Sequence, residues 1–441
     1  MSEPKSNPYE VFTFPEFRWF ILNRFFATMA FSIQFVVIEW EIYQLTKNVF
    51  YLGLIPLAEI IAVVIFSLFS GHYVDKWKKK LSLQICLISA IICTLIFSFI
   101  FSDYTISRFS IQKILIFTLL NVFFWGIIRA FYTPSAFSLF SYLIPKKHFP
   151  SGATWNASAW QIGAVLGPII AGISYAFFGG FYTFFISLLF LILGLFFIFQ
   201  IKEKELAYNH KEKIWNSLKQ GFSFIYNNKI VFSAITIDLF AVLFGGAVAL
   251  LPVFVADIIP VETYAKPLKY IASLFDYHFK DENQMKSFGL GILRGAPSIG
   301  ALITMITITY FPVNHKSGMK LLIFVALFGM SIIGFGLSTS FWLSFVLLLL
   351  SGLFDGVSVV IRSTILQILT PDEMRGRVSA VNSIFVGSSN EFGAFESGLT
   401  AKLFGTVKAV VLGGSITLLV VIISFFKAKT LRNFEIKDFK N

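Results

Sequence analysis

The chain has 441 residues, of which 56% are hydrophobic and only 14% are charged. No polar stretch exceeds about 30 residues, whereas a soluble domain typically needs roughly 100, so an ordinary soluble domain is excluded. The formal net charge of +12 suggests nucleic acid binding in a soluble protein, but here the basic residues gather in alternate loops between apolar runs, the pattern that orients a membrane protein.

Long apolar runs follow one another from Arg18 to Lys427. About 20 apolar residues cross roughly 30 Å of hydrocarbon as a helix, and a chain in lipid must satisfy its backbone hydrogen bonds internally. We therefore predict an all-α membrane protein with about twelve transmembrane helices. The predicted spans lie near residues 18–44, 50–74, 81–101, 114–140, 153–178, 181–201, 230–256, 287–309, 321–338, 342–368, 378–404 and 406–426.

The loop at residues 202–229 divides these spans six and six. It predicts an N-terminal bundle (1–201), a linker (202–229) and a C-terminal bundle (230–441). The linker has apolar residues at helical spacing among lysines, which predicts either a helix on the inner membrane face or a solvated linker helix. These apolar residues are Trp215, Leu218, Phe222 and Ile225. The excess of basic residues in alternate loops predicts that both termini are cytoplasmic.

A repeat relates the two halves of the sequence. The offset from Pro145 to Pro371 is 226 residues, and the same offset links four further pairs of identical residues. These pairs are Gly126 with Gly352, Asn156 with Asn382, Gly167 with Gly393, and Gly172 with Gly398. Duplication of a six-helix unit is typical of transporters, which bind substrate between the repeats. We expect two pseudo-symmetric six-helix bundles.

The loop after the second span carries a small residue, a carboxylate and a basic cluster, at Gly71, Asp75, Lys79 and Lys80. It resembles the signature loop of the major facilitator superfamily, although Lys78 stands where that loop has glycine. By analogy with that fold, Asp75 meets a cation or the positive N-terminus of the eleventh span and latches one conformation. The alternative is a simple positive-inside anchor.

A motif in the predicted fifth span resembles one associated with exporters of that superfamily. It contains Gly163, Gly167, Pro168 and Gly172. Small residues one turn apart allow two helices to approach closely, and proline bends a helix.

Further segments narrow the resemblance to the enterobactin-exporter and macrolide-efflux branch. They are Phe17 with Arg18, residues 43–46, residues 126–134 and residues 370–378. The resemblance runs over residues 17–427 and implies proton-coupled export of a bulky amphipathic small molecule, of siderophore or drug class, across a bacterial inner membrane. The implied partners are substrate, protons and lipid, with a monomeric protein and no nucleic acid.

Ionisable residues within the predicted spans are the candidate functional groups, because charge in hydrocarbon is costly and usually faces a cavity or a partner. They are Arg24, Glu39, Glu41, Glu59, Arg129, Asp238, Arg294, Asp355, Arg362, Glu391 and Glu396. Arg24 and Arg362 lie near span ends, where we expect them to extend to the interface. For Glu41 that interpretation and a functional role remain equally open.

The proton or substrate candidates are Glu39, Glu59, Arg129, Asp238, Asp355, Glu391 and Glu396. Glu391 and Glu396 are the sharpest pair, because the repeat offset places them opposite Val165 and Ile170 of the first half. At 100° per residue they lie about 140° apart around a helix, so they need not share a face. The offset also places Arg129 opposite Asp355, as a charge pair across the halves or as two groups with local partners.

The loop at residues 261–286 is longer than the resemblance leads us to expect, and forms either a short lid helix or a plain insertion. The lid helix would present Leu268, Ile271, Leu274 and Phe275. The sequence shows no metal-ligand spacing and no G-x-x-x-x-G-K-[ST] loop, so we expect no metal, no cofactor, no ATP drive and no enzymatic activity. The alternatives are import of a ferric siderophore, lipid flipping, or an intramembrane enzyme or sensor.

Overall fold

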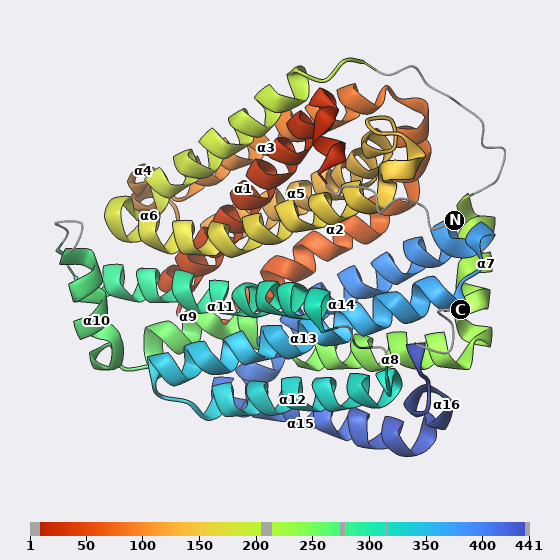
Figure 1. The fold of residues 1–441 in the computed structure, drawn as a ribbon. Coiled ribbons are helices and arrows are strands. Elements are labelled where there is room, and N and C mark those ends of the chain that lie inside the picture. Colours follow the sequence, from red (N-terminus) through yellow and green to blue (C-terminus); the bar gives the residue numbers. More distant parts are fainter. Residues whose placement is uncertain are drawn as a thin grey trace. The chain divides into compact units, whose positions relative to one another are not determined.

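The computed structural model describes residues 9–203, 214–273, 278–279, 281–311, 313 and 315–436. In this part of the chain all regular secondary structure is helical (Figure 1). The chain forms two compact units: a first unit of Met1–Glu41 and Ala58–His210, and a second unit of Ile42–Leu57 and Lys211–Asn441.

Six α-helices form within residues 9–203. They are α1 (Pro15–Thr46), α2 (Val49–Lys76), α3 (Lys79–Ile100), α4 (Asp103–Arg108), α5 (Ile111–Phe140) and α6 (Phe149–Phe199). Helix α6 contains two predicted spans, because Gly179 interrupts it with a φ of 79°. That backbone conformation suits glycine, which lacks a Cβ atom.

The helices of the second half follow the predicted spans closely. They are α7 (Ile214–Asn227), α8 (Lys229–Phe244), α9 (Leu251–Val253), α10 (Glu262–Ser273), α11 (Glu282–Tyr310), α12 (Ser317–Leu337), α13 (Phe341–Leu369), α14 (Arg375–Phe404), α15 (Thr406–Lys427) and α16 (Lys429–Arg432). The predicted span 230–256 is interrupted after α8, where the chain continues through a 3₁₀ turn (Ala247–Leu250), the short α9 and a π turn (Phe254–Ile258).

Ten described helices are long and apolar enough to cross a membrane. Helix α6 counts once among them although it holds two spans separated by the kink at Gly179. Helix α14 is not among them, because Glu391, Glu396 and several serines make it more polar than the others. Each of the twelve predicted spans thus corresponds to a helix, to part of one, or to α8 with the short turns that follow it.

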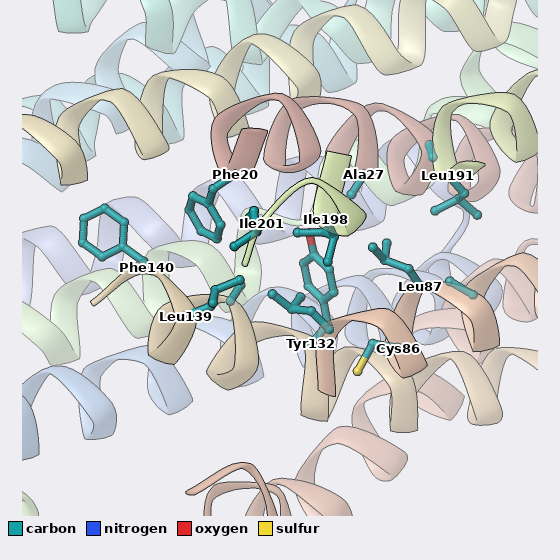
Figure 2. Packing of buried hydrophobic residues seen from close by; sticks show 14 of the residues in the cluster. Phe20, Ala27, Cys86, Leu87, Tyr132, Leu139, Phe140, Leu191, Ile198 and Ile201 are labelled. Carbon is teal, nitrogen blue, oxygen red and sulfur yellow. The ribbon is translucent and has the colours of Figure 1, made fainter. Parts of the chain in front are cut away.

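The core of the first unit lies where α1, α3, α5 and the second part of α6 meet (Figure 2). Its buried side chains include Phe20, Leu87, Tyr132, Leu139 and Ile198. Cys86 and Cys93 are buried in the same cluster as free thiols, as expected for core-filling cysteines.

Helix α8 contributes much of the core of the second unit. Its buried residues pack with side chains from α7, α12, α13, α14 and α15. The buried members contributed by α8 are Val231, Ala234, Ile235, Ile237 and Ala241.

The same glycines make the same kind of contact in both units, which supports the repeat. A Cβ on Gly126 would lie 2.5 Å from the carbonyl oxygen of Glu59 in α2, and one on Gly352 would overlap the carbonyl of Pro297 in α11. Likewise Gly167 approaches the backbone of α1, and Gly393 approaches the backbone of α8. The duplicated positions therefore preserve close helix packing within each unit.

Tyr43 and Gly53 are among the residues that join the segment Ile42–Leu57 to the rest of the second unit. Tyr43 donates a hydrogen bond to the carboxylate of Asp257. A Cβ on Gly398 would lie 2.7 Å from the Cα of Gly53, so α14 and the start of α2 touch backbone to backbone.

The linker contains a helix, as predicted, and this helix packs on α14. A Cβ on Gly221 would lie 2.7 Å from the carbonyl oxygen of Arg377, and the Arg377 guanidinium donates to Gln220. Ile225 is buried, whereas Phe222 remains half-exposed and stacks on Phe385 with 6.2 Å between ring centroids. Side chains of residues 214–218, including Trp215 and Leu218, lie outside the described part.

The loop at 261–286 forms the predicted short helix, α10. Leu268 and Tyr264 are fully buried, and the Tyr264 ring packs on Phe341 with 4.5 Å between centroids. Burial raises the pKa of the Tyr264 phenol, and the nearby carboxylates of Glu282 and Glu262 raise it further, so this phenol stays protonated at neutral pH. The side chain of Ile271, and residues Leu274 and Phe275, lie outside the described part.

Candidate functional site

The first unit contains a buried ion pair between α2 and α5. The Arg129 guanidinium donates to the carboxylate of Glu59, which is completely buried, whereas the Arg129 side chain is 44% exposed. The close approach of the two helices at Gly126 brings these side chains together. The repeat offset left two possibilities for Arg129, a pair with Asp355 across the halves or a local partner. Arg129 has the local partner, Glu59.

The second unit contains a buried ion pair between α8 and α13. Arg362 pairs with the carboxylate of Asp238, and both residues are about 5% exposed. The prediction that Arg362 extends to the membrane interface is wrong. Its guanidinium stays inside, because the Asp238 carboxylate on the adjoining helix supplies the compensating charge.

Asp355 lies two helical turns before Arg362 on α13. It is half-buried, and the described residues offer its carboxylate no hydrogen bond and no ion pair. Arg294 on α11 is also half-buried. A carboxylate without a partner in hydrocarbon is costly, so Asp355 is a candidate for contact with an ion, a proton or a substrate.

A cavity of about 410 Å³ opens between α8 and α14 in the second unit. Its walls are mainly apolar and aromatic, with two serines and one carboxylate among them. They are formed by Leu239, Leu243, Phe385, Ser388, Ser389, Phe392, Phe395 and Glu396. The volume lies within the roughly 300–1,000 Å³ typical of small-molecule sites.

Of the two acidic residues predicted on α14, Glu396 lines this cavity and Glu391 does not. One carboxylate oxygen of Glu396 accepts a 2.6 Å hydrogen bond from Thr400, one turn along the helix. Glu391 is half-buried. The two acids therefore occupy different surroundings, as their angular separation indicated.

Two further acids lie near the end of α1. Glu41 is buried and accepts a 2.9 Å hydrogen bond from the Tyr175 hydroxyl of α6, so it does not extend to the interface. Glu39 is also buried, at 4% exposure. Arg24, lower on α1, is half-buried.

The glycine motif of α6 lies in a helix contact, and the basic loop motif lies at the turn between α2 and α3. Gly163 and Gly167 of α6 face α1, where a Cβ on either would lie 3.0 Å or less from its nearest atom. At the α2–α3 turn, Lys79 is buried and donates to the Val74 carbonyl, and Lys80 donates to Phe199 at 3.0 Å. Gly71 lies in α2, but the Asp75 side chain lies outside the described part, so the latch itself stays a prediction.

The cavity walls were not anticipated from the sequence. The signal was present, because Phe385, Ser388, Ser389, Phe392 and Glu396 recur at three and four residues, one face of a helix. In a chain with 55 phenylalanines, such a stripe does not stand out. Among the described residues, no three His, Cys, Asp or Glu side chains group as metal ligands.

Comparisons with solved structures show the fold. The chain is similar to a D-xylose–proton symporter, with a TM-score of 0.66 and 12% identity over 93% of this chain and 99% of that one. It is also similar to a bacterial homologue of the human lysosomal transporter Spinster, with a TM-score of 0.64 and 13% identity over 99% and 98%. A variant of the nucleoside transporter NupG matches with a TM-score of 0.65 and 12% identity over 94% and 100%.

Sequence comparison identifies the family. No curated protein matches the chain. The family model of the Major Facilitator Superfamily matches residues 20–275, more than half of the chain. Together with the fold of the two units, this match establishes that the chain belongs to the Major Facilitator Superfamily.

Proposed function

We propose that this protein is a secondary active transporter that exports a bulky amphipathic small molecule in exchange for protons. The observation that carries the proposal is the aromatic cavity of the second unit with Glu396 in its wall. A concave, mainly apolar site with few polar groups suits a large amphipathic ligand better than a sugar or a small ion. In this superfamily, the two halves rock to expose such a site alternately.

The buried charges divide into two groups with different proposed roles. Glu59 and Asp238 are paired with arginines, and breaking a buried pair is strongly unfavourable. We assign them to holding helices together. Asp355 has no partner among the described residues, and Glu396 is hydrogen-bonded only to Thr400 there. Together with Glu391, these are the proposed proton or substrate groups, because a carboxylate in a cavity can bind and release protons.

The direction of transport rests on the motif at Gly163, Gly167, Pro168 and Gly172, which resembles that of exporters. The orientation rests on the basic residues of alternate loops, which favour cytoplasmic termini in a bacterial inner membrane. The latch around Asp75 is part of the same proposal. Asp75→Asn should slow turnover more than it weakens substrate binding, and equal turnover would remove the latch from the mechanism.

Transport into membrane vesicles of opposite orientation tests the proposal. Vesicles with the protein and matched vesicles without it are energised with a proton gradient and given a panel of siderophores and amphipathic antibiotics. Export predicts accumulation of at least one compound in inside-out vesicles, and collapse of that accumulation with a protonophore. An importer of a ferric siderophore accumulates its substrate only in right-side-out vesicles.

Two further outcomes identify the remaining alternatives. Movement of a labelled lipid between leaflets, with no soluble compound accumulated, supports a lipid flippase of the same fold. Hydrolysis of a substrate by the purified protein, with no solute movement in either vesicle type, supports an intramembrane enzyme and overturns the transport proposal.

A further inference from the structure

We infer that the cavity between α8 and α14 binds a lipophilic organic cation, with Glu396 as its counter-ion. This inference rests on the proposed transport function and names the substrate class of the same site. It concerns only residues of the second unit, all of which lie on two helices that pack on each other.

The first argument is charge. Among the described residues, Glu396 is the only ionisable one that lines the cavity. One of its oxygens accepts from Thr400, and among the described residues no cationic side chain pairs with the carboxylate. An ionised carboxylate in apolar surroundings gains most from a cation that arrives within a few ångströms, because the local dielectric constant is low.

The second argument is the aromatic wall. Phe385, Phe392 and Phe395 line the cavity from α14, and Phe392 is 42% exposed. The face of a phenyl ring attracts an organic cation while its apolar surface accepts hydrocarbon. Leu239 and Leu243 complete the wall from α8. Three rings and one carboxylate are the combination that recognises a cation carrying apolar groups.

The third argument is what the cavity disfavours. A ligand with several negative charges would meet the Glu396 carboxylate, and no described residue of the wall is cationic. For the many hydroxyl groups of a neutral sugar, the described part of the wall offers two serine side chains and one carboxylate. Within the classes proposed above, this cavity therefore favours cationic drug-like compounds over anionic siderophores.

Tetraphenylphosphonium and tetraphenylborate test the inference, because they have the same shape and opposite charge. Binding of each is measured by calorimetry to the purified full-length protein in nanodiscs, corrected for binding to empty nanodiscs. The inference predicts saturable binding of tetraphenylphosphonium alone. Equal binding of both ions, or binding of neither, would overturn it.

Variants locate the bound cation. Glu396→Gln should weaken tetraphenylphosphonium binding at least tenfold, because it removes the charge and keeps the shape, and Phe392→Ala should weaken it about fivefold. Glu373→Gln removes an exposed acid from the 3₁₀ turn that precedes α14 and should leave the affinity unchanged. Melting temperatures of the variants show whether each is folded. A folded Glu396→Gln protein with wild-type affinity would refute the assignment.

The assay uses no gradient, so it separates this inference from the proposed function. Cation binding that depends on Glu396, without transport in any vesicle, would remove the transport proposal and leave the site standing. Transport of a compound in vesicles, with no charge preference in nanodiscs, would remove the site and leave the transport proposal.

Discussion

The two units share their helix packing and differ in their charges. At the repeated positions Gly126 and Gly352, and again at Gly167 and Gly393, a glycine lets one helix touch the backbone of its neighbour. The buried ion pair, however, joins α2 to α5 in the first unit and α8 to α13 in the second. A close backbone contact tolerates few residue types besides glycine. An ion pair, in contrast, can join a different pair of helices in each unit, provided that both charged residues change position together.

A second difference concerns the acids of α13 and α14. Where the first half has Val165 and Ile170, the second half has Glu391 and Glu396, and Glu396 faces a cavity. Asp355 stands at the position equivalent to Arg129, whose guanidinium is paired with Glu59. At these equivalent positions the first half thus has a paired arginine and two apolar residues, and the second half has three acids.

Removing one partner of the second unit's ion pair should have the largest effect on stability. Asp238→Ala or Arg362→Ala leaves an uncompensated buried charge and should cost about 3–5 kcal/mol. The double change Asp238→Leu with Arg362→Met should recover most of that loss. Thermal unfolding in detergent measures both.

The first unit's pair supplies the contrast for this prediction. Glu59→Gln should cost less than Asp238→Asn, because the arginine left without its partner in the first unit, Arg129, is 44% exposed and partly hydrated, whereas Arg362 stays buried. Equal losses would show that exposure does not distinguish the two pairs.

Substitution of the shared glycines should have the next largest effect. A Cβ on Gly352 would overlap the Pro297 carbonyl, and one on Gly126 would lie 2.5 Å from the Glu59 carbonyl. Gly352→Ala and Gly126→Ala should each destabilise their unit by about 1–3 kcal/mol, since α-helical backbones must separate. The matched control is Gly387→Ala on α14, where the new Cβ meets nothing within 4 Å. Gly387→Ala should be neutral or stabilising, because alanine favours a helix more than glycine does. A loss as large at Gly387 would show that close contact does not set the effect.

Loss of a single buried hydrogen bond should cause the third largest loss of stability. Tyr175→Phe removes the hydroxyl that donates to Glu41 and should cost about 1 kcal/mol, or more if the carboxylate stays charged. Phe177→Leu, a nearby apolar change on α6, serves as the comparison. An unchanged melting temperature for Tyr175→Phe would mean that Glu41 finds another donor.

The smallest effect on stability is expected at Asp355. Because no described residue pairs with its carboxylate, Asp355→Asn should change the free energy of unfolding by less than about 0.5 kcal/mol. The same variant should reduce proton-driven accumulation in vesicles, because it removes a titratable group. Strong destabilisation would reveal a structural partner and end the case for a functional Asp355.

Much of the fold was predictable from the sequence, because apolar runs of membrane length leave the backbone little choice but a helix. The exceptions have local causes. Gly179 kinks α6 without ending it, so two predicted spans appear as one helix. The pair Gly245–Gly246 interrupts the seventh span, which continues as short turns.

The site was harder to predict, because the sequence lists buried charges without their partners. Arg362 lies near the end of its span and was expected to extend to the interface, yet Asp238 on another helix holds it inside. Of the pair on α14 the sequence favoured Glu391, yet Glu396 is the one that lines the cavity between α8 and α14. Such distinctions depend on the orientation of each helix about its own axis. The apolar pattern of the sequence does not specify this orientation, because the lipid-facing and the buried surfaces are both hydrophobic.

The most direct test of the transport account is the efflux of ethidium, a fluorescent lipophilic cation, from preloaded cells that express the protein. The account predicts that wild-type protein accelerates energy-dependent efflux over cells with an empty vector, and that Glu396→Gln at equal membrane abundance abolishes this acceleration while Glu373→Gln retains it. Efflux that is identical with and without wild-type protein, or unaffected by Glu396→Gln, would contradict the account.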